Sequence, residues 1–410
     1  MRVLYSFAIL IYSFFINAAA LAGNKKAVLW VLGRKNWKEN LVSLNQDKKK
    51  ITWFHVASLG EFEQARPLIE EIKREDPKEF ILVSFFSPSG YEIRKDYKLA
   101  DKVIYLPVDT PKNAKTFLNI VQPHRIIFVK YEFWFNYLSQ IRLQNIECYL
   151  ICGIFRKNQH FFKPYGGWFK KHLAAFNHFF VQNDESLKLL KSIGFKNASK
   201  TGDTRLDRVL SISKESFSEK RFESFSKDSS VLIIGSSWER ENELAIKFSN
   251  SDIATKIIIA PHEIDAPKFK SLQGRFTSSC KLLSETTPDE DLHLLKVLII
   301  DRIGLLSKLY RYGNIAFIGG GFGLGIHNTL EAVIYGCPVL FGPNYKKFQE
   351  AYDLLEIGAG FCVRNQEEFY ATIRFLNDES NYQNAITKAK SYVNDKAGAT
   401  PKILDYLYEK

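Results

Sequence analysis

A short glycine-rich segment in the last third of the chain has the composition of a site for a phosphate group. Five glycines fall within residues 319–325, and they follow an apolar run at 315–318 that predicts a buried strand. Glycine lets a backbone turn sharply and come close to a ligand. A helical pattern begins at Asn328, so free backbone N–H groups and the positive end of a helix dipole are expected to meet there. The segment therefore predicts an anion site that includes Gly320 and Gly321.

The same segment does not identify the phosphate compound. It matches neither the G-x-G-x-x-G fingerprint of dinucleotide-binding proteins nor the G-K-[ST] of a P-loop. One interpretation is a nucleotide-sugar site in which Glu331 binds ribose hydroxyls. The other is a tight turn followed by a capping box, because Asn328 and Glu331 have the N-cap and N3 spacing. The two interpretations are compatible.

Other polar turns in the second half of the chain also follow predicted strands. Because ligands of open α/β sheets bind at the carboxyl ends of the strands, these turns are candidate nucleotide contacts. They contain Ser236 and Ser237, then Pro261 and His262, and then Ile303, Gly304 and Leu305.

The first half of the chain supplies candidate acids and a cation. Glu61 lies at the tip of a strand-to-helix turn, where a general base needs a reachable carboxylate. The alternative is that Glu61 only complements the dipole of the helix that follows. Glu132 is a second acid at a strand end, and Arg205 is a cation that could offset phosphate charge.

The elements that must position these residues alternate between strand and helix, which predicts two α/β domains with parallel sheets. A Ser-, Lys- and Glu-rich stretch at 211–230 separates them, so we expect domains at residues 25–210 and 211–410 with a ligand in a cleft between them. Strands are expected at 51–58, 80–86, 103–106, 125–129, 148–151, 178–181, 231–235, 254–260, 297–300, 315–318, 339–341 and 360–363.

Residues 3–22 form an apolar stretch that is just long enough to cross a bilayer as a helix. Lysines and arginines follow this stretch, which predicts a membrane anchor at residues 1–24 with the rest of the chain in the cytoplasm. The alternative is a signal peptide cleaved after an A-x-A-like site that ends at Ala22. Residues 155–172 interleave basic and aromatic side chains, which suits an anionic membrane surface, single-stranded nucleic acid or a helix with its aromatics in the core.

The overall composition agrees with a folded protein that has an anionic partner. The formal charge is +12, from 57 basic and 45 acidic residues. Five scattered cysteines without a C-x-x-C pair favour a reducing compartment. The histidines show no metal-ligand spacing, so we expect no bound metal and no other cofactor.

Seven segments together carry a resemblance, in one order over nearly the whole chain: WFHVASLGE at 53–61, SPSG at 87–90, YEFWFN at 131–136, FVQN at 180–183, GDTRLD at 202–207, APHE at 260–263 and the glycine-rich region at 317–341. In these segments the chain resembles the 3-deoxy-D-manno-octulosonic acid (Kdo) transferases of lipid A biosynthesis. The joint match is specific, although no single motif is.

The resemblance implies an inverting glycosyltransferase of the GT-B type, with two Rossmann-like domains. It implies CMP-Kdo as donor and the lipid A precursor as acceptor, at the cytoplasmic face of the inner membrane, with an anionic membrane surface and no nucleic acid as partner. Glu61 matches the catalytic base, and Glu132 and Arg205 match residues that support the transition state. The implied nucleotide contacts are Pro261, His262, Ile303, Gly304, Leu305, Asn328, Thr329, Leu330 and Glu331.

The chain differs from the family pattern at two positions, and two other functions remain possible from the sequence. Many members have Pro-Arg-His where this chain has Ala-Pro-His, which puts an arginine contact to the donor in doubt, and Arg205 stands where lysine is common. One alternative is another GT-B glycosyltransferase or a sugar-nucleotide epimerase that uses a UDP- or GDP-sugar. The other is a secreted two-domain binding protein. The number of Kdo residues transferred and the oligomeric state stay open.

Overall fold

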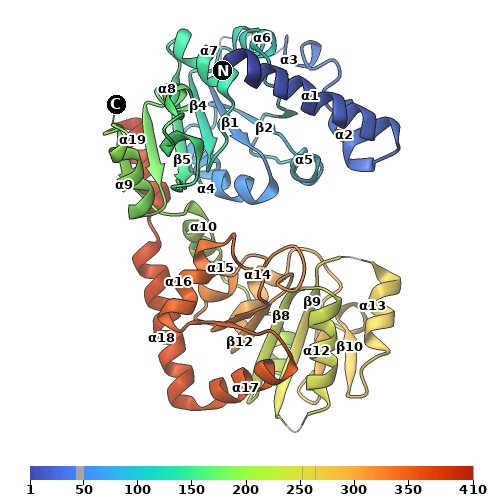
Figure 1. Ribbon diagram of the computed structural model, residues 1–410. Coiled ribbons are helices and arrows are strands. Elements are labelled where there is room, and N and C mark those ends of the chain that lie inside the picture. The colour runs from blue at the N-terminus through green and yellow to red at the C-terminus, as the bar shows by residue number, and fades with distance from the viewer. Residues whose placement is uncertain (43–49, 252, 264, 410) are drawn as a thin grey trace. The chain divides into compact units, whose positions relative to one another are not determined.

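The computed structural model describes residues 1–410 except 43–49, 252, 264 and 410. The chain divides into two compact units, and each is described by itself (Figure 1). Unit 1 comprises Met1–Asp207 together with Gly398–Lys410, and unit 2 comprises Arg208–Ala397.

Unit 1 is built on a parallel sheet of seven strands in the order β3-β2-β1-β4-β5-β6-β7. Central strands are buried on both faces, as their continuous apolar composition predicts. One apolar cluster covers each face. The strands are β1 (Ile51–Val56), β2 (Phe80–Phe85), β3 (Lys102–Tyr105), β4 (Arg125–Val129), β5 (Glu147–Gly153), β6 (His178–Val181) and β7 (Ala198–Lys200).

Helices connect these strands and lie on both sides of the sheet (Figure 1). They are α1 (Arg2–Leu21), α2 (Lys25–Leu32), α3 (Glu39–Val42), α4 (Leu59–Glu75), α5 (Pro88–Arg94), α6 (Pro111–Val121), α7 (Phe135–Leu143), the 3₁₀ turn η2 (His160–Phe162), α8 (Gly167–Leu173), α9 (Asp184–Ser192) and α10 (Thr204–Lys214), whose last residues belong to unit 2.

Unit 2 repeats this architecture, with strand order β10-β11-β9-β8-β12-β13-β14. Its strands are β8 (Ser230–Ser237), β9 (Thr255–Pro261), β10 (Cys280–Leu282), β11 (Val297–Ile299), β12 (Ile315–Ile318), β13 (Val339–Phe341) and β14 (Gly360–Cys362). Its helical elements are α11 (Lys220–Ser226), α12 (Glu239–Ser249), α13 (Ala266–Gln273), η3 (Leu283–Glu285), α14 (Leu306–Leu309), η4 (Tyr310–Tyr312), α15 (Leu330–Val333), α16 (Gln349–Ile357), α17 (Gln366–Asn377) and α18 (Glu379–Lys396).

Both sheets reverse their strand order at one point. In unit 1 the chain leaves β1 for β2 and β3 and then returns to place β4 on the other side of β1. In unit 2 the same reversal puts β12 beside β8. In doubly wound sheets, the carboxyl ends of the strands at such a reversal form the usual ligand site. The two α/β domains expected from the sequence are therefore confirmed.

The last helix, α19 (Ala399–Tyr408), differs from the expected domain plan. The sequence places residues 211–410 in one domain, but α19 packs on unit 1, where Ile403 and Leu404 join the apolar core of one sheet face. The Asp207 carboxylate accepts hydrogen bonds from the backbone N–H of Gly398 (2.5 Å) and Thr400 (2.6 Å). The second domain therefore ends at Ala397.

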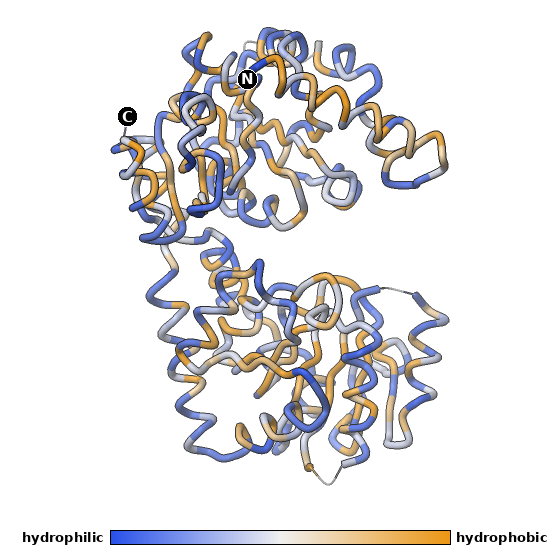
Figure 2. The backbone as a smooth tube through the Cα atoms, in the orientation of Figure 1, coloured by the Kyte–Doolittle hydropathy of each residue, from blue (hydrophilic) through white to orange (hydrophobic). Residues whose placement is uncertain are grey.

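The apolar N-terminal stretch forms α1 and is the one described helix long and apolar enough to cross a membrane. It does not stand apart from unit 1, as a separate anchor of residues 1–24 would. Tyr5 Oη donates a 2.6 Å hydrogen bond to the buried Asp109 carboxylate, and the Tyr12 ring stacks on Phe86. The opposite face of α1 is apolar and exposed. Figure 2 shows apolar residues along much of this helix.

Candidate functional site

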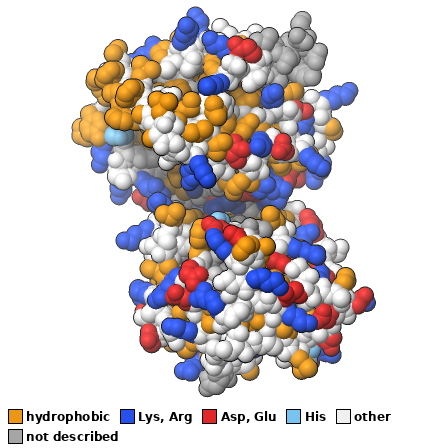
Figure 3. Space-filling view, turned by 90° about the vertical axis from the view of Figure 1, so that its right-hand side faces the viewer, with side chains coloured by type: hydrophobic (Ala, Val, Ile, Leu, Met, Phe, Trp, Pro, Cys, Tyr) orange, Lys and Arg blue, Asp and Glu red, His pale blue; other side chains and the backbone are white. Residues whose placement is uncertain are grey.

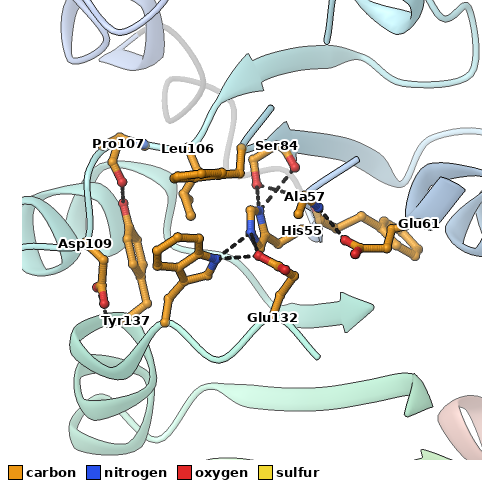
Figure 4. Close-up of polar contacts among 12 residues, drawn as sticks. His55, Ala57, Glu61, Ser84, Leu106, Pro107, Asp109, Glu132 and Tyr137 are labelled. Atoms are coloured by element: carbon orange, nitrogen blue, oxygen red, sulfur yellow. Dashed lines mark hydrogen bonds and ion pairs between the residues drawn. The ribbon is translucent and has the colours of Figure 1, made fainter. Parts of the chain in front are cut away.

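Glu61 lies in the first turn of α4, directly after β1 at the strand reversal of unit 1. The helix begins at Leu59, and the Ser58 hydroxyl caps it by accepting from the Glu61 N–H. Glu61 Oε2 accepts a 2.5 Å hydrogen bond from the Ala57 N–H (Figure 4). Its other oxygen, Oε1, has no hydrogen-bond partner among the described residues.

Burial is the main influence on the pKa of the Glu61 carboxyl group. The Glu61 side chain is only 6% exposed, and desolvation together with the negative charge of Glu132 raises its pKa to about 8. The Ala57 N–H and the positive charge of Lys130 act in the opposite direction but are outweighed. A carboxyl group with this pKa is mostly protonated at pH 7. Its ionised fraction, which grows as the pH rises toward 8, is a stronger base than an ordinary carboxylate and can accept a proton as a general base.

Glu132 follows β4, the neighbour of β1, so the strand reversal brings the two expected acids to the same edge of the sheet. Glu132 Oε2 accepts a 2.9 Å hydrogen bond from the indole Nε1 of Trp134, and it lies 3.4 Å from His55 Nε2 (Figure 4). His55 is fully buried on β1 and contacts Ser84 on β2 through Nδ1.

Arg205 lies next to this edge but is held by a carboxylate of its own. Its guanidinium contacts both oxygens of Asp203, with Nη2 to Oδ2 at 2.7 Å. Gln64, which is on the same helix as Glu61, donates to Asp203 Oδ2 at 3.0 Å. Part of the positive charge expected to face a phosphate is therefore offset by Asp203.

Lys130 is a cation of this site that the sequence interpretation did not single out. It lies between β4 and Glu132, and its positive charge lowers the pKa of both Glu61 and Asp203. Its backbone has a φ of 66°, a left-handed conformation that is uncommon outside glycine. In the sequence, the only sign that Lys130 belongs to the site was its position directly after a buried strand.

The candidate donor residues of unit 2 gather at one edge of its sheet. Strands β11, β9, β8 and β12 are neighbours and parallel, so the segments that follow them lie together. These segments carry Ile303, Gly304 and Leu305 after β11, Pro261 and His262 at the end of β9, Ser236 and Ser237 at the end of β8, and Asn328, Thr329, Leu330 and Glu331 after β12.

A cavity of about 420 Å³ opens at this edge, with Ser237, Trp238 and Pro261 in its wall. Two basic side chains, Lys268 and Arg275, also line it. Each of them is paired with an acid, Lys268 with Glu263 and Arg275 with Glu239.

Three aromatic rings stack beside these residues, and two of them were not expected. Trp238 stacks on His262 at a centroid distance of 4.7 Å, and His262 stacks on His327 at 4.4 Å. The Trp238 indole N–H donates to His327 Nε2 over 3.1 Å. Burial and the neighbouring His262 lower the pKa of His327 to about 4, so this imidazole is neutral at pH 7.

The glycines of the 319–325 segment allow close packing of the backbone, whereas the sequence predicted that they would face a phosphate. A side chain at Gly319 would meet the Ser236 carbonyl oxygen at 2.1 Å, and one at Gly321 would meet the Gly342 nitrogen at 2.5 Å. The Gly320 N–H, expected to be free for a phosphate, donates instead to the Glu241 carboxylate at 2.9 Å. These glycines therefore let backbone segments of the protein approach each other.

The helix after this segment also differs from the expectation. It is the short α15, which begins at Leu330 with Thr329 as the N-cap residue. Asn328 and Glu331 do not form a capping box, because the Asn328 side-chain amide donates directly to Glu331 Oε1 at 3.0 Å. Thr329 Oγ1 and Ser237 Oγ are buried at this edge without a hydrogen-bond partner among the described residues.

The basic and aromatic segment at 155–172 divides its side chains between core and surface. Phe155 and Phe161 are buried in the core of unit 1, whereas Tyr165 is 60% exposed. Lys170 and Lys171 point to the surface. Within the described ranges, no group of three His, Cys, Asp or Glu side chains is arranged to hold a metal ion.

Comparison with known proteins finds one family model and several curated relatives that are similar to this chain. Residues 35–208 match the family model of 3-deoxy-D-manno-octulosonic-acid transferase (kdotransferase). The 3-deoxy-D-manno-octulosonic acid transferase of Aquifex aeolicus is 28% identical over 337 residues, which cover 80% of this chain and 86% of the relative.

Solved structures show the same fold at low identity. The UDP-GlcNAc 2-epimerase of Neisseria meningitidis has a TM-score of 0.59 at 16% identity and covers 88% of this chain and 99% of its own. MurG of Acinetobacter baumannii has a TM-score of 0.56 at 12% identity and covers 88% and 100%. The chain has the GT-B fold. Residues 35–208 match the Kdo transferase family model, and most of the chain is similar to Kdo transferases, which are glycosyltransferases.

Proposed function

We propose that this protein transfers Kdo from CMP-Kdo to a hydroxyl group of the lipid A precursor, and that Glu61 is the base. The observation that carries the proposal is the buried Glu61 carboxylate, whose pKa is raised to about 8 and whose Oε1 has no hydrogen-bond partner in the part of the chain that the structure describes. It lies at the edge of the sheet where a ligand is expected.

In the proposed reaction, Glu61 takes the proton of the acceptor hydroxyl as that oxygen forms a bond to the anomeric carbon of Kdo. The bond between this carbon and the phosphate oxygen of CMP breaks, and CMP leaves with the electron pair. Arg205 and Lys130 are the unit 1 cations proposed to balance the negative charge. The edge of unit 2 that carries Ser237, Pro261 and Glu331 is proposed to hold the nucleotide. We propose that no metal ion is required.

We further propose that the protein works on the cytoplasmic face of the inner membrane with α1 retained. The contacts of Tyr5 and Tyr12 with unit 1 support retention, because cleavage after Ala22 would remove them. The N-terminal residue of the mature protein, determined by sequencing, tests this part. A mature chain that begins after Ala22 would contradict it.

The decisive experiment uses the full chain and the substitution Glu61→Gln. We expect transfer to fall by about 10² to 10⁴-fold, because the amide cannot accept the proton, while CMP still binds. Glu71→Gln on the same helix is the matched control and keeps its activity. Full activity of Glu61→Gln would remove Glu61 from the role of base.

The substrates need a separate test. The wild-type chain is incubated with CMP-Kdo and the lipid A precursor, and the lipid product is weighed by mass spectrometry. We expect a product heavier by whole Kdo residues, and CMP to inhibit its formation more strongly than UDP. Stronger inhibition by UDP, or an unchanged lipid, would contradict the proposed substrates.

A further inference from the structure

A cavity of about 580 Å³ lies in unit 1 near the start of α1, between this helix and helices α7 and α8. It is separate from the edge of the sheet that carries Glu61. Three exposed cations, one half-buried histidine, one serine and three apolar side chains line it: Arg2, Arg142, Lys171, His172, Ser139, Leu138, Leu143 and Trp168.

The three cations of this cavity have no counterion among the residues that the structure describes. No carboxylate lines the cavity, and none of Arg2, Arg142 and Lys171 forms an ion pair with another described residue. All three act on the neighbouring His172, whose pKa is lowered by burial and by their positive charges. Like charges that surround one cavity repel each other, and an anion in the cavity would relieve this repulsion.

The surface around the cavity is apolar. Side chains at every third or fourth position of α1, such as Tyr5, Ile9 and Ser13, are partly covered by unit 1, so the helix lies along its surface. The opposite face is exposed, with Leu4 at 65%, Phe7 at 60% and Phe14 at 68%. Figure 3 shows hydrophobic side chains gathered on unit 1 with Lys and Arg side chains among them.

This combination of features fits one kind of occupant. An exposed apolar helix face is suited to the acyl region at a membrane surface, and Trp168 and the exposed Tyr165 are of the type that occupies the headgroup level. Cations beside such a helix attract anionic lipids. We propose that this cavity binds the phosphate of an anionic phospholipid, with α1 lying in the plane of the membrane. This inference rests on the membrane location proposed above.

The first experiment measures sedimentation of the full chain with vesicles of phosphatidylcholine, with and without phosphatidylglycerol. We expect the triple variant Arg2→Gln, Arg142→Gln, Lys171→Gln to lose at least about tenfold in affinity for the anionic vesicles. Its weak binding to pure phosphatidylcholine, which depends on α1, stays unchanged. The matched control is Lys188→Gln, Lys191→Gln, Lys196→Gln, which removes the same charge from another surface of unit 1 and loses less than about threefold.

Equal losses in the two triple variants would overturn the proposal in favour of a diffuse charge effect. Thermal unfolding of each variant checks that it is folded. The assay contains neither CMP-Kdo nor the lipid A precursor, so its failure would not affect the proposed reaction. Conversely, Glu61→Gln is expected to bind vesicles as the wild type does even though its transfer of Kdo is strongly reduced.

The second experiment follows the titration of His172 by NMR. An anion beside the imidazole stabilises its protonated form, so short-chain phosphatidylglycerol is expected to raise the pKa of His172 and to leave that of His124, also in unit 1, unchanged. Short-chain phosphatidylcholine and inorganic phosphate at the same concentration are expected to change neither. An equal effect of inorganic phosphate would assign the cavity to free phosphate and overturn the proposal.

Discussion

The indole Nε1 of Trp134 donates a hydrogen bond to Nε2 of His55 over 2.8 Å. Nε2 must therefore accept, and the proton of the imidazole lies on Nδ1, within 2.9 Å of Ser84 Oγ. The same indole N–H reaches Glu132 Oε2 at 2.9 Å. The single indole N–H of Trp134 is thus shared between His55 and the carboxylate whose charge raises the pKa of Glu61.

Replacement of Trp134 by Phe tests this arrangement. Phe keeps the aromatic contact with Phe86 but removes the N–H, so Glu132 loses a donor and His55 is left with an unpaired buried acceptor. We expect a loss of about 1–3 kcal/mol in the free energy of unfolding, measured by urea denaturation. The control Trp168→Phe removes an indole that has no side-chain hydrogen bond in the described structure. Equal stabilities of the two variants would contradict the proposed role of the shared N–H.

The substitution Glu132→Gln is expected to change the pH dependence of transfer. Without the negative charge of Glu132, the pKa of Glu61 falls, because repulsion between the carboxylates no longer favours the protonated form. The rising limb of kcat/KM against pH then moves to lower pH. Glu71→Gln on α4 serves as the control and leaves the limb in place. A limb that moves upward or does not move would show that Glu132 does not control the base.

Protein stability is expected to fall as the pH rises from about 4.5 to about 8. In the folded chain Glu61 keeps its proton up to about pH 8, whereas the unfolded chain releases it near the ordinary value of 4.5. The unfolded state therefore binds fewer protons in this range, and this carboxyl contributes a slope on the order of −1 kcal/mol per pH unit. The urea midpoint of Glu61→Gln, compared with the wild type, should lack this contribution. Parallel pH profiles of the two proteins would count against the raised pKa.

Two glycines of the 319–325 segment give a matched pair of variants. A side chain at Gly321 would lie 2.5 Å from the Gly342 nitrogen, whereas one at Gly323 has 3.7 Å to its nearest neighbour. We expect Gly321→Ala to lower the free energy of unfolding by about 1–3 kcal/mol and Gly323→Ala to change it little. CMP affinity, measured by calorimetry, separates ligand contact from packing. A Gly323→Ala variant that is stable but binds CMP poorly would restore the phosphate role to this part of the segment.

The hydrogen bond from Tyr5 to Asp109 predicts how firmly α1 is attached to unit 1. Tyr5→Phe removes a 2.6 Å bond to a buried carboxylate, so we expect faster amide hydrogen exchange along α1. Tyr12→Phe removes a hydroxyl that has no hydrogen bond among the described residues and is the control. Unchanged exchange in Tyr5→Phe would mean that the aromatic contacts alone hold the helix.

The continuously apolar strands could be predicted from the sequence because both of their faces are buried. Residues 125–129, 178–181, 315–318 and 339–341 form strands with the expected bounds. The edge strands β7 and β10 were missed because three residues with polar members, such as Ala198–Lys200, have no clear periodicity. The return of α19 to unit 1 depends on long-range contacts with Asp207, which no local pattern reveals.

The residues of the candidate site also fall into two groups, those that could be predicted from the local sequence and those that could not. Glu61 and Glu132 could be identified because each follows an apolar strand, and the strand order then brings them to one edge. The role of Gly320 could not, because its N–H is taken by Glu241, which lies 79 positions away in the sequence. His55, Trp134, His327 and Lys130 acquire their importance only from neighbours on other elements.

The attachment of α19 to unit 1 sets an order for biosynthesis. The ribosome releases all of unit 2 before it releases Ile403 and Leu404, which complete the core of the unit that was begun first. Until α19 emerges from the ribosome, the nascent first unit exposes the apolar surface that these two side chains will cover, although Glu61 and Glu132 have long since emerged.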